Sequence, residues 1–180
     1  MNDGHIYFVS FAVVYWIDLF TRVEYFNVVF DSLDYCERNK GLELYAYCIM
    51  PSHIHLIIGS KQDPLEGIMR DFKSFTSRKL RETIGNHTGE SRKEWMLWMI
   101  ERAGKKSSHH HGFQLWQGNH PIELYKPEIV KQKLDYIHNN PVESGLVSLP
   151  EHWRYSSATN YMQLQSAREV ILLDVFYNIR

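Results

Sequence analysis

The apolar residues along this chain follow two spacings, which predict a mixture of strands and helices. Residues 7–15, 42–50 and 53–58 are dense in β-branched and aromatic side chains, as strands are. Pro51-Ser52 separates the second of these stretches from the third by only two residues. We therefore expect these two strands to form a hairpin or a bent pair.

In other stretches the apolar residues recur every three or four positions, which is the spacing of helices. One such stretch, residues 20–36, follows the first strand, and Asn39-Lys40-Gly41 is a typical helix end. A long helix opens at Asp63-Pro64. A further helix begins at Pro127, and we expect Asn140-Pro141 to end it, because the residue before proline disfavours helical backbone.

The order of these elements predicts the fold class. Residues 85–112 form a helical insert, followed by short strand pieces at 113–116 and 121–124. The resulting order, β-α-β-β-α-insert-β-α, predicts an α+β fold of the ferredoxin-like, split βαβ type. In this prediction an antiparallel sheet carries its helices on one face. We expect a single domain over residues 1–180, with a core at about 5–161 and a C-terminal extension at 162–180.

Composition bounds the cellular setting. Two cysteines, Cys36 and Cys48, are too few for a disulfide framework, and both lie in apolar surroundings. We therefore expect buried free thiols in a reducing compartment. The apolar run at 7–17 is too short to span a membrane and lacks the flanks of a signal peptide. These observations predict a cytoplasmic protein with no membrane partner.

The net charge of −1 hides an uneven distribution of charged residues. Residues 70–106 hold ten basic and five acidic residues, a local net charge of +5. Charge alone favours a solvated helix face, but a basic segment can also bind phosphates. The candidate DNA-binding residues are Arg70, Lys73, Arg78 and Arg81 on the long helix, with Lys105 and Lys106 beyond it.

His53 and His55 are the first residues that suggest chemistry. Side chains two apart on a strand share a face, and their Cα atoms lie about 6.6 Å apart. Two neutral imidazoles at that spacing can bind one divalent metal ion. For an isolated pair, two histidines on the polar face of a half-buried strand remain the favoured interpretation.

Tyr136 and Asn140 form a second pair, four residues apart on one face of the last helix. A tyrosine hydroxyl can act as a nucleophile, and an amide oxygen can be a third, neutral metal ligand. Alone, a packed tyrosine and a capping asparagine are the favoured interpretation. Together with the histidines and the basic helix, the set fits phosphodiester cleavage through a covalent phosphotyrosine.

Two longer stretches carry a resemblance to a known family. Residues 45–56 read YAYCIMPSHIHL, and residues 135–142 read DYIHNNPV, followed by Gly145-Leu146-Val147. They resemble the metal-binding strand and the tyrosine helix of the single-tyrosine HUH transposases. Trp116-Gln117 and residues 155–158 also resemble the REP-associated tyrosine transposase branch.

This resemblance implies a function in detail. It implies a DNA transposase that binds a DNA hairpin and cuts single-stranded DNA beside it, leaving a 5′-phosphotyrosine and a free 3′-hydroxyl. Tyr136 would be the nucleophile, and His53, His55 and Asn140 would hold Mg²⁺ or Mn²⁺. No ATP is needed, because the phosphotyrosine conserves the energy of the broken bond. The resemblance leaves open whether the protein acts as a monomer or as a homodimer that exchanges tyrosines.

Three alternatives remain open at this point. A domesticated hairpin-DNA-binding protein without transposition activity would need the basic helix as much as an active transposase does. A small ferredoxin-like RNA-binding protein ranks last, because the strands lack a pattern of exposed stacking aromatics. The three successive histidines at 109–111 could suggest a second metal site, but neighbouring loop residues do not fix a coordination geometry, so we expect a plain loop.

Overall fold

The computed structural model describes residues 5–107, 112–118 and 121–174. Its elements are β1 (Tyr7–Val13), the 3₁₀ turn η1 (Val14–Trp16), α1 (Val23–Lys40), β2 (Leu42–Ile49), β3 (His53–Ser60), α2 (Leu65–Asn86), α3 (Lys93–Lys106), β4 (Trp116–Gln117), β5 (Ile122–Glu123), α4 (Pro127–Glu143), the 3₁₀ turn η2 (Pro150–His152) and α5 (Ala158–Tyr161).

The strands form one antiparallel sheet in the order β2-β3-β1-β4, with β5 also paired to β1. β4 and β5 pair with opposite ends of β1, at Val13↔Trp116 and Tyr7↔Glu123, and so share the place of a fourth strand. β2 and β3 pair as the expected hairpin, from Leu42↔Ser60 to Ile49↔Ile54. The α+β, split βαβ prediction is confirmed.

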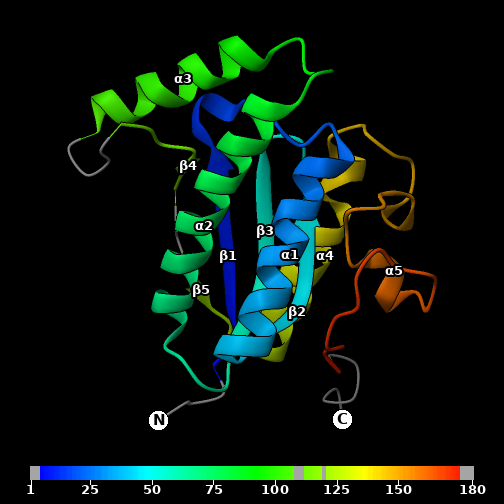
Figure 1. Cartoon of the computed structure of the whole chain (residues 1–180). Helices are drawn as coiled ribbons and strands as arrows, with labels where there is room; N and C mark the ends of the chain where they lie inside the picture. The colour runs from blue at the N-terminus through cyan, green and yellow to red at the C-terminus, as the bar shows by residue number, and fades with distance from the viewer. Residues whose placement is uncertain (1–4, 108–111, 119–120, 175–180) are drawn as a thin grey trace.

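The helices lie on both faces of the sheet, which corrects the prediction that they share one face (Figure 1). α1 and α2 cover one face over a large apolar core that includes Val9, Phe11 and Leu56. α4 covers the other face, where Phe8, Ala46, Cys48 and Ile57 meet its stripe of Val130, Leu134 and Ile137. Successive residues of a strand point to opposite faces of the sheet, and in these strands successive residues are apolar. Both faces of the sheet therefore need a layer of helices.

α4 continues one turn beyond its expected end at Asn140-Pro141 and runs to Glu143. Proline lacks only its own N–H, and a helix tolerates that loss near an end where the turn is closed by other bonds. Here the N–H of Leu146 donates to the carbonyl of Pro141, and that of Gly145 to Val142. Gly145 has φ +73°, the left-handed conformation that this kind of helix end requires.

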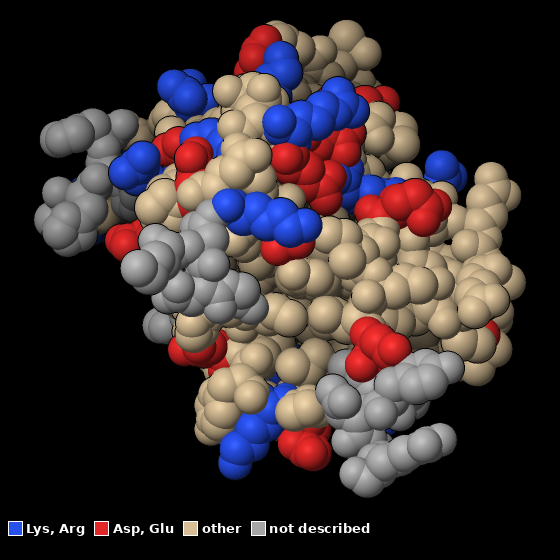
Figure 2. All heavy atoms as spheres, turned by 90° about the horizontal axis from the view of Figure 1, so that it is seen from below, with Lys and Arg blue, Asp and Glu red and all other residues tan. Residues whose placement is uncertain are grey.

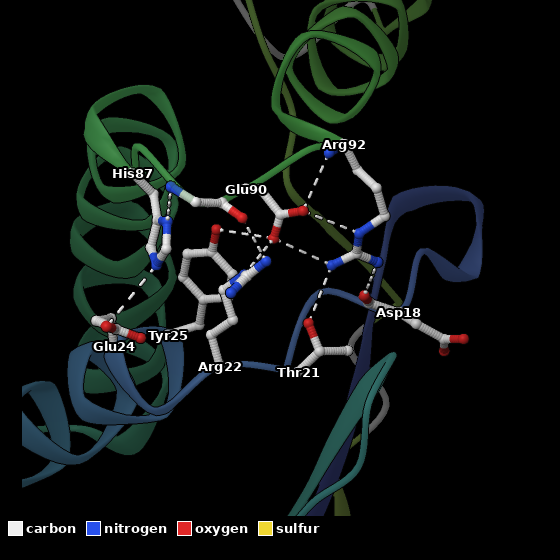
Figure 3. A network of polar contacts seen from close by, with 9 residues as sticks. Asp18, Thr21, Arg22, Glu24, Tyr25, His87, Glu90 and Arg92 are labelled. Atoms are coloured by element: carbon white, nitrogen blue, oxygen red, sulfur yellow. Dashed lines mark hydrogen bonds and ion pairs between the residues drawn. The ribbon is translucent and has the colours of Figure 1, made fainter.

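The helical insert is fixed to the rest of the fold by a buried carboxylate, Glu90 (Figure 3). Arg22 Nε donates to Glu90 Oε2 at 3.0 Å, and Arg92 Nε donates to Oε1 at 3.1 Å. Tyr25 adds a hydroxyl bond of 3.2 Å to Oε2. This network ties the connection between α2 and α3 to the start of α1.

Gly104 lies inside α3 rather than in the expected loop. A Cβ at this position would stand 2.4 Å from the Cα of Phe113, so only glycine allows the returning chain to cross the helix so closely. The helix continues past Gly104 and ends at Lys106.

The segment after α5 packs back on the sheet. Arg168 pairs with Asp34 and Glu37 of α1, and the N–H of Ile171 donates to the carbonyl of Leu44 at 2.9 Å. β2 is an edge strand, so this segment covers an otherwise open row of backbone groups. Both cysteines are buried and free, as expected. Within the described ranges, no helix is long and apolar enough to cross a membrane.

Candidate active site

His53 and His55 lie on β3, between β2 and β1, on the face of the sheet that α4 covers. The register sets Ala12 opposite His53 and Ser10 opposite His55, which gives the rings small neighbours on β1. The two ring centroids are 4.7 Å apart, so the pair shares one face as the alternation predicts.

The two imidazoles differ in their partners. Ser52 Oγ lies 3.2 Å from His53 Nδ1, whereas both ring nitrogens of His55 are buried and have no hydrogen-bond partner. Burial, with smaller contributions from the neighbouring His53 and Lys133, lowers the pKa of His55 to about 3. Burial also lowers the pKa of His53, and the nearby Asn140, whose amide oxygen can accept from the protonated ring, opposes this shift. Both rings are therefore neutral near pH 7, the form that binds metal.

α4 brings Tyr136 and Asn140 to the histidines within one chain. Its apolar stripe packs on the sheet, and this fixes the rotation of the helix. The ring centroid of Tyr136 lies 5.3 Å from that of His55, and the Asn140 side chain lies close enough to His53 to raise the pKa of that imidazole. Tyr136 is 40% exposed while Asn140 is 9% exposed, so the hydroxyl-bearing ring faces solvent and the amide lies inside.

Two further residues shape the site and were not identified from the sequence. Phe8 stacks on His55 with centroids 5.7 Å apart and meets Tyr136 edge-on at 6.0 Å. Lys133 Nζ lies 4.8 Å from the Phe8 ring centroid and 5.6 Å from that of Tyr136. The sequence signals for these two residues were weak. Phe8 is two residues before Ser10 on the strand, so its side chain points to the same face, and Lys133 lies about one helical turn before Tyr136.

The donor set fits a divalent cation. His55 offers buried nitrogens with no other use, and Ser52 beside His53 Nδ1 leaves the other nitrogen of that ring for a ligand. Asn140 adds a neutral amide next to His53. The described part of the chain contains no cluster of three or more His, Cys, Asp or Glu side chains suited to a metal, so any ion here would rely on the amide.

The basic residues of α2 do not surround this site. α2 packs on the opposite face of the sheet, where Lys73 Nζ lies 4.8 Å from the ring centroid of Phe11. Lys73 also donates to the carbonyl of Gly118, and burial lowers its pKa to about 8. Arg70 pairs with Asp71. The contacts of Lys73 favour a structural role, whereas the Arg70 side chain is 76% exposed and its pair with the adjacent Asp71 lies at the surface.

The other candidate DNA-binding residues differ in their partners. Arg81 pairs with Glu101 at 2.9 Å. Among the described residues, Arg78, Lys105 and Lys106 are exposed and have no recorded ion pair or hydrogen bond. Seen from below, acidic and basic side chains are interspersed rather than gathered by sign (Figure 2).

Several other residues that the sequence raised have structural places. His138 is half-buried and its Nε2 lies 2.8 Å from Ser157 Oγ, so it faces away from the site, and desolvation lowers its pKa to about 4. The indole of Trp116 is buried and donates to Thr76 at 2.9 Å, which agrees with packing. The His109–His111 tract and His120 lie outside the described residues.

The chain is similar to known proteins in sequence and in fold. The family model described as "Transposase IS200 like" matches residues 18–101, a stretch that contains both histidines and ends before α4. A REP-associated tyrosine transposase, solved bound to a REP hairpin, has a similar fold: TM-score 0.64 and 16% identity, covering 96% of this chain and 90% of that one. A predicted transposase from Deinococcus radiodurans R1 aligns at 19% identity over 74% of this chain and 88% of that one. Its TM-score of 0.45 is too low to indicate a shared fold. No curated protein matches the sequence.

The resemblance indicated by the motifs is confirmed. The chain is similar to the IS200-like transposases in sequence, and to a REP-associated tyrosine transposase in fold.

Proposed function

We propose that this protein cuts and rejoins single-stranded DNA beside a hairpin, with Tyr136 as the nucleophile. One observation carries the proposal: His55 is a buried imidazole without a partner, the rings of His53 and Tyr136 lie beside it, and Asn140 lies beside His53 in the same chain. Buried polar atoms in folded proteins almost always have partners, so an orphaned imidazole favours a ligand that is bound in use.

His53, His55 and Asn140 would hold one Mg²⁺ or Mn²⁺ ion. When bound there, such an ion would polarise a non-bridging phosphate oxygen and stabilise negative charge on the phosphate. The two imidazoles and the amide bring no negative charge, so the ion would keep its full attraction for phosphate. Ser52, beside Nδ1 of His53, would fix the orientation of that ring.

Tyr136 would attack the phosphorus from the exposed side of the site. Its phenolic oxygen forms a bond to phosphorus while the bond from phosphorus to the 3′ oxygen breaks. The phenolic proton leaves to solvent, and the 3′ oxygen takes up a proton to become a free hydroxyl. The products are a 5′-phosphotyrosine and a 3′-hydroxyl, and attack by a 3′-hydroxyl on the phosphotyrosine reverses the step.

Lys133 would assist Tyr136 by its charge. Its ammonium group lies over the same ring that carries the attacking oxygen, at 5.6 Å from the centroid. A positive charge there favours the phenolate that develops during attack and attracts the incoming phosphate. This role explains why a lysine lies against the apolar Phe8.

A DNA hairpin is the partner that the fold favours, because the REP-associated transposase of similar fold was solved with one. Arg78, Lys105 and Lys106 are the most available of the predicted contacts for phosphates, since they are exposed and their side chains have no ion pair within the described part of the chain, although Arg78 lies on α2, away from the histidines. Each phosphate that they neutralise should steepen the salt dependence of binding by roughly one unit of log–log slope.

The test is capture of the covalent adduct. The protein is incubated with labelled stem-loop DNAs that carry single-stranded flanks, including the flanks of its own gene, with Mn²⁺, and is then denatured. We expect a labelled protein band that is lost with EDTA, in Tyr136→Phe and in His53→Ala. Tyr125→Phe is the matched control, since that ring is 71% exposed and lies outside the site.

Other outcomes separate the alternatives. An adduct that persists in Tyr136→Phe refutes the assigned nucleophile. Tight hairpin binding that is unaffected by His53→Ala, with no cleavage across the whole set of DNAs, identifies a DNA-binding protein without transposition activity. Preference for the RNA form of the same stem-loop excludes both.

A further inference from the structure

The turn that follows β1 exposes two large aromatic side chains beside the candidate active site. Tyr15 and Trp16 are 41% and 60% exposed, although they interrupt an apolar stretch whose other members are buried. Val14 on one side is 3% exposed and Ile17 on the other is 5% exposed. The chain therefore turns both rings outward while it anchors the backbone on either side of them.

This outward turn requires an unfavourable backbone. Tyr15 has φ +58° and Trp16 has φ +55°, and residues other than glycine rarely adopt such values. The turn is held by backbone bonds of 2.8 Å from Val13 to Ser52 and from Val14 to Leu115. Two strained aromatic residues in succession, rigidly held and open to solvent, are typical of a binding surface.

The position of Trp16 relates this turn to the histidines. Its ring meets that of His53 edge-on, with centroids 5.4 Å apart, and His53 in turn meets His55 at 4.7 Å. A nucleotide next to a phosphate bound at the histidines would reach the indole without any movement of the chain. Stacking on an exposed aromatic ring is the common way in which proteins hold an unpaired base.

The other side of the turn offers a place for the next phosphate. Tyr15, Gln117 and Lys106 line one hollow of about 190 Å³. The backbone N–H of Tyr15 donates to Gln117 Oε1 at 3.2 Å, which fixes that side chain, while Lys106 at the end of α3 is exposed. Aromatic rings and a lysine in sequence along a surface suit a single strand, which presents bases and phosphates alternately.

We infer that η1 is a stacking platform for single-stranded DNA, on which Trp16 holds the base next to the phosphate that is cut. This inference rests on the proposed function for the choice of DNA as ligand. Trp16 is a positioning residue: it fixes the strand relative to Tyr136 and takes no part in bond making. Lys106 neutralises a phosphate on the far side of Tyr15.

The experiment measures binding without cleavage. Stem-loop DNAs carry single-stranded extensions on both sides, with the fluorescent base 2-aminopurine at each extension position in turn, and EDTA is present throughout. We expect the wild-type protein to quench the fluorescence at one or two neighbouring positions. Trp16→Ala should lose this quenching and weaken binding by roughly 5- to 100-fold, whereas Trp16→Phe keeps most of both.

Two controls separate stacking from a structural role. Tyr35→Ala removes a ring that is 58% exposed on α1, over the opposite face of the sheet, and should bind as the wild type does. Trp16→Gly removes the indole and also relieves the positive φ, so it should melt at or above the temperature of Trp16→Ala yet bind equally weakly. Lys106→Gln should lower the salt slope by roughly one unit and leave quenching unchanged.

The possible failures are distinguishable. Equal binding and equal quenching in Trp16→Ala overturn the inference, even when Tyr136-dependent cleavage is intact. Absence of any single-strand binding by the wild type also overturns it. Quenching that depends on Trp16 in a protein that cuts no DNA upholds the platform and refutes the proposed transposase chemistry.

Discussion

Among the buried polar side chains of the described residues, those around Glu90 and those around His55 differ in how their polar atoms are used. The Glu90 carboxylate, whose side chain is 0% exposed, accepts bonds from Arg22, Arg92 and Tyr25 on its two oxygens. His55 is 4% exposed, and neither ring nitrogen has a partner. One cluster is complete within the protein, and the other is not.

This difference in hydrogen bonding suggests that the Glu90 cluster stabilises the fold and that the His55 cluster does not. A buried charge with all of its bonds made holds elements in place, and removing it leaves its partners uncompensated. A buried imidazole without a bond costs the fold about 1–3 kcal/mol. A cluster that carries such a cost is best explained by a ligand that supplies the missing partner. The contrast predicts opposite responses to substitution.

The largest expected effect is on cleavage in His55→Leu. Leucine fills a similar volume without a polar atom, so the metal-free protein should become more stable by about 1 kcal/mol. Cleavage should fall by about 10³-fold or more, because phosphate charge would no longer be stabilised. Adduct formation and urea unfolding in EDTA measure the two effects. Loss of stability in His55→Leu would contradict an orphaned imidazole.

The next effect is on stability in Glu90→Gln. Two arginines, each about one third exposed, would lose their buried counter-charge, and the free energy of unfolding should fall by about 3 kcal/mol. Glu82→Gln is the matched control: Glu82 pairs with Lys79 in solvent, so its change should stay within about 1 kcal/mol. The folded fraction of Glu90→Gln should retain Tyr136-dependent cleavage. A stable Glu90→Gln that has lost cleavage would place Glu90 in the active site.

A smaller effect is expected from metal on thermal stability. A ligand that binds only the folded state stabilises it by about 2.7 kcal/mol at a hundredfold excess over its Kd. Mn²⁺ should therefore raise the Tm of the wild type and of Glu82→Gln, and leave His55→Leu unchanged. Calorimetric scans at several Mn²⁺ concentrations measure the shift. An equal rise in His55→Leu would mean that the metal binds elsewhere.

The sequence predicted much of the fold because strand and helix signals were strong and local. The hairpin at Pro51-Ser52 and the start of α4 at Pro127 were predicted correctly. The face that each helix covers was not, since it depends on the far side of strands that are apolar at successive positions. Pro141 misled because proline signals a helix end only to within about a turn.

The candidate site was predictable in part for the same reason. Strand alternation predicts that His53 and His55 share a face, and helical spacing predicts the same of Tyr136 and Asn140, whereas their assignment to one site came from the family resemblance. Their convergence depends on how α4 packs. Phe8 and Trp16 carry no signal of their own, because an aromatic residue in an apolar stretch predicts burial. Lys73 was predicted to bind phosphate, yet it is partly buried and donates to the carbonyl of Gly118. The sequence shows that a side chain is charged but not which groups surround it in the fold.

The smallest effect separates the two clusters by pH. Hydrogen bonds from Arg92 and Arg22 lower the pKa of Glu90 to about 2, below the 4.5 of a free side chain. The unfolded chain therefore binds a proton more readily between these values, so the stabilisation by Glu90 is complete above about pH 4.5 and is lost as the pH falls toward 2. The neutral histidines act in a window that begins higher, because their pKa values are lowered from 6.5 to about 3 for His55 and about 4 for the half-buried His138. The unfolded chain binds protons more readily below about pH 6.5, so stability falls as the pH drops through this window. Urea unfolding between about pH 3 and pH 7 in EDTA should show both slopes. Glu90→Gln should flatten only the acid end, and His55→Leu should reduce the slope that begins near pH 6.5 to the part that His138 contributes. If Glu90→Gln changed the upper slope instead, the two clusters would be coupled, and the division between a structural cluster and a ligand site would fail.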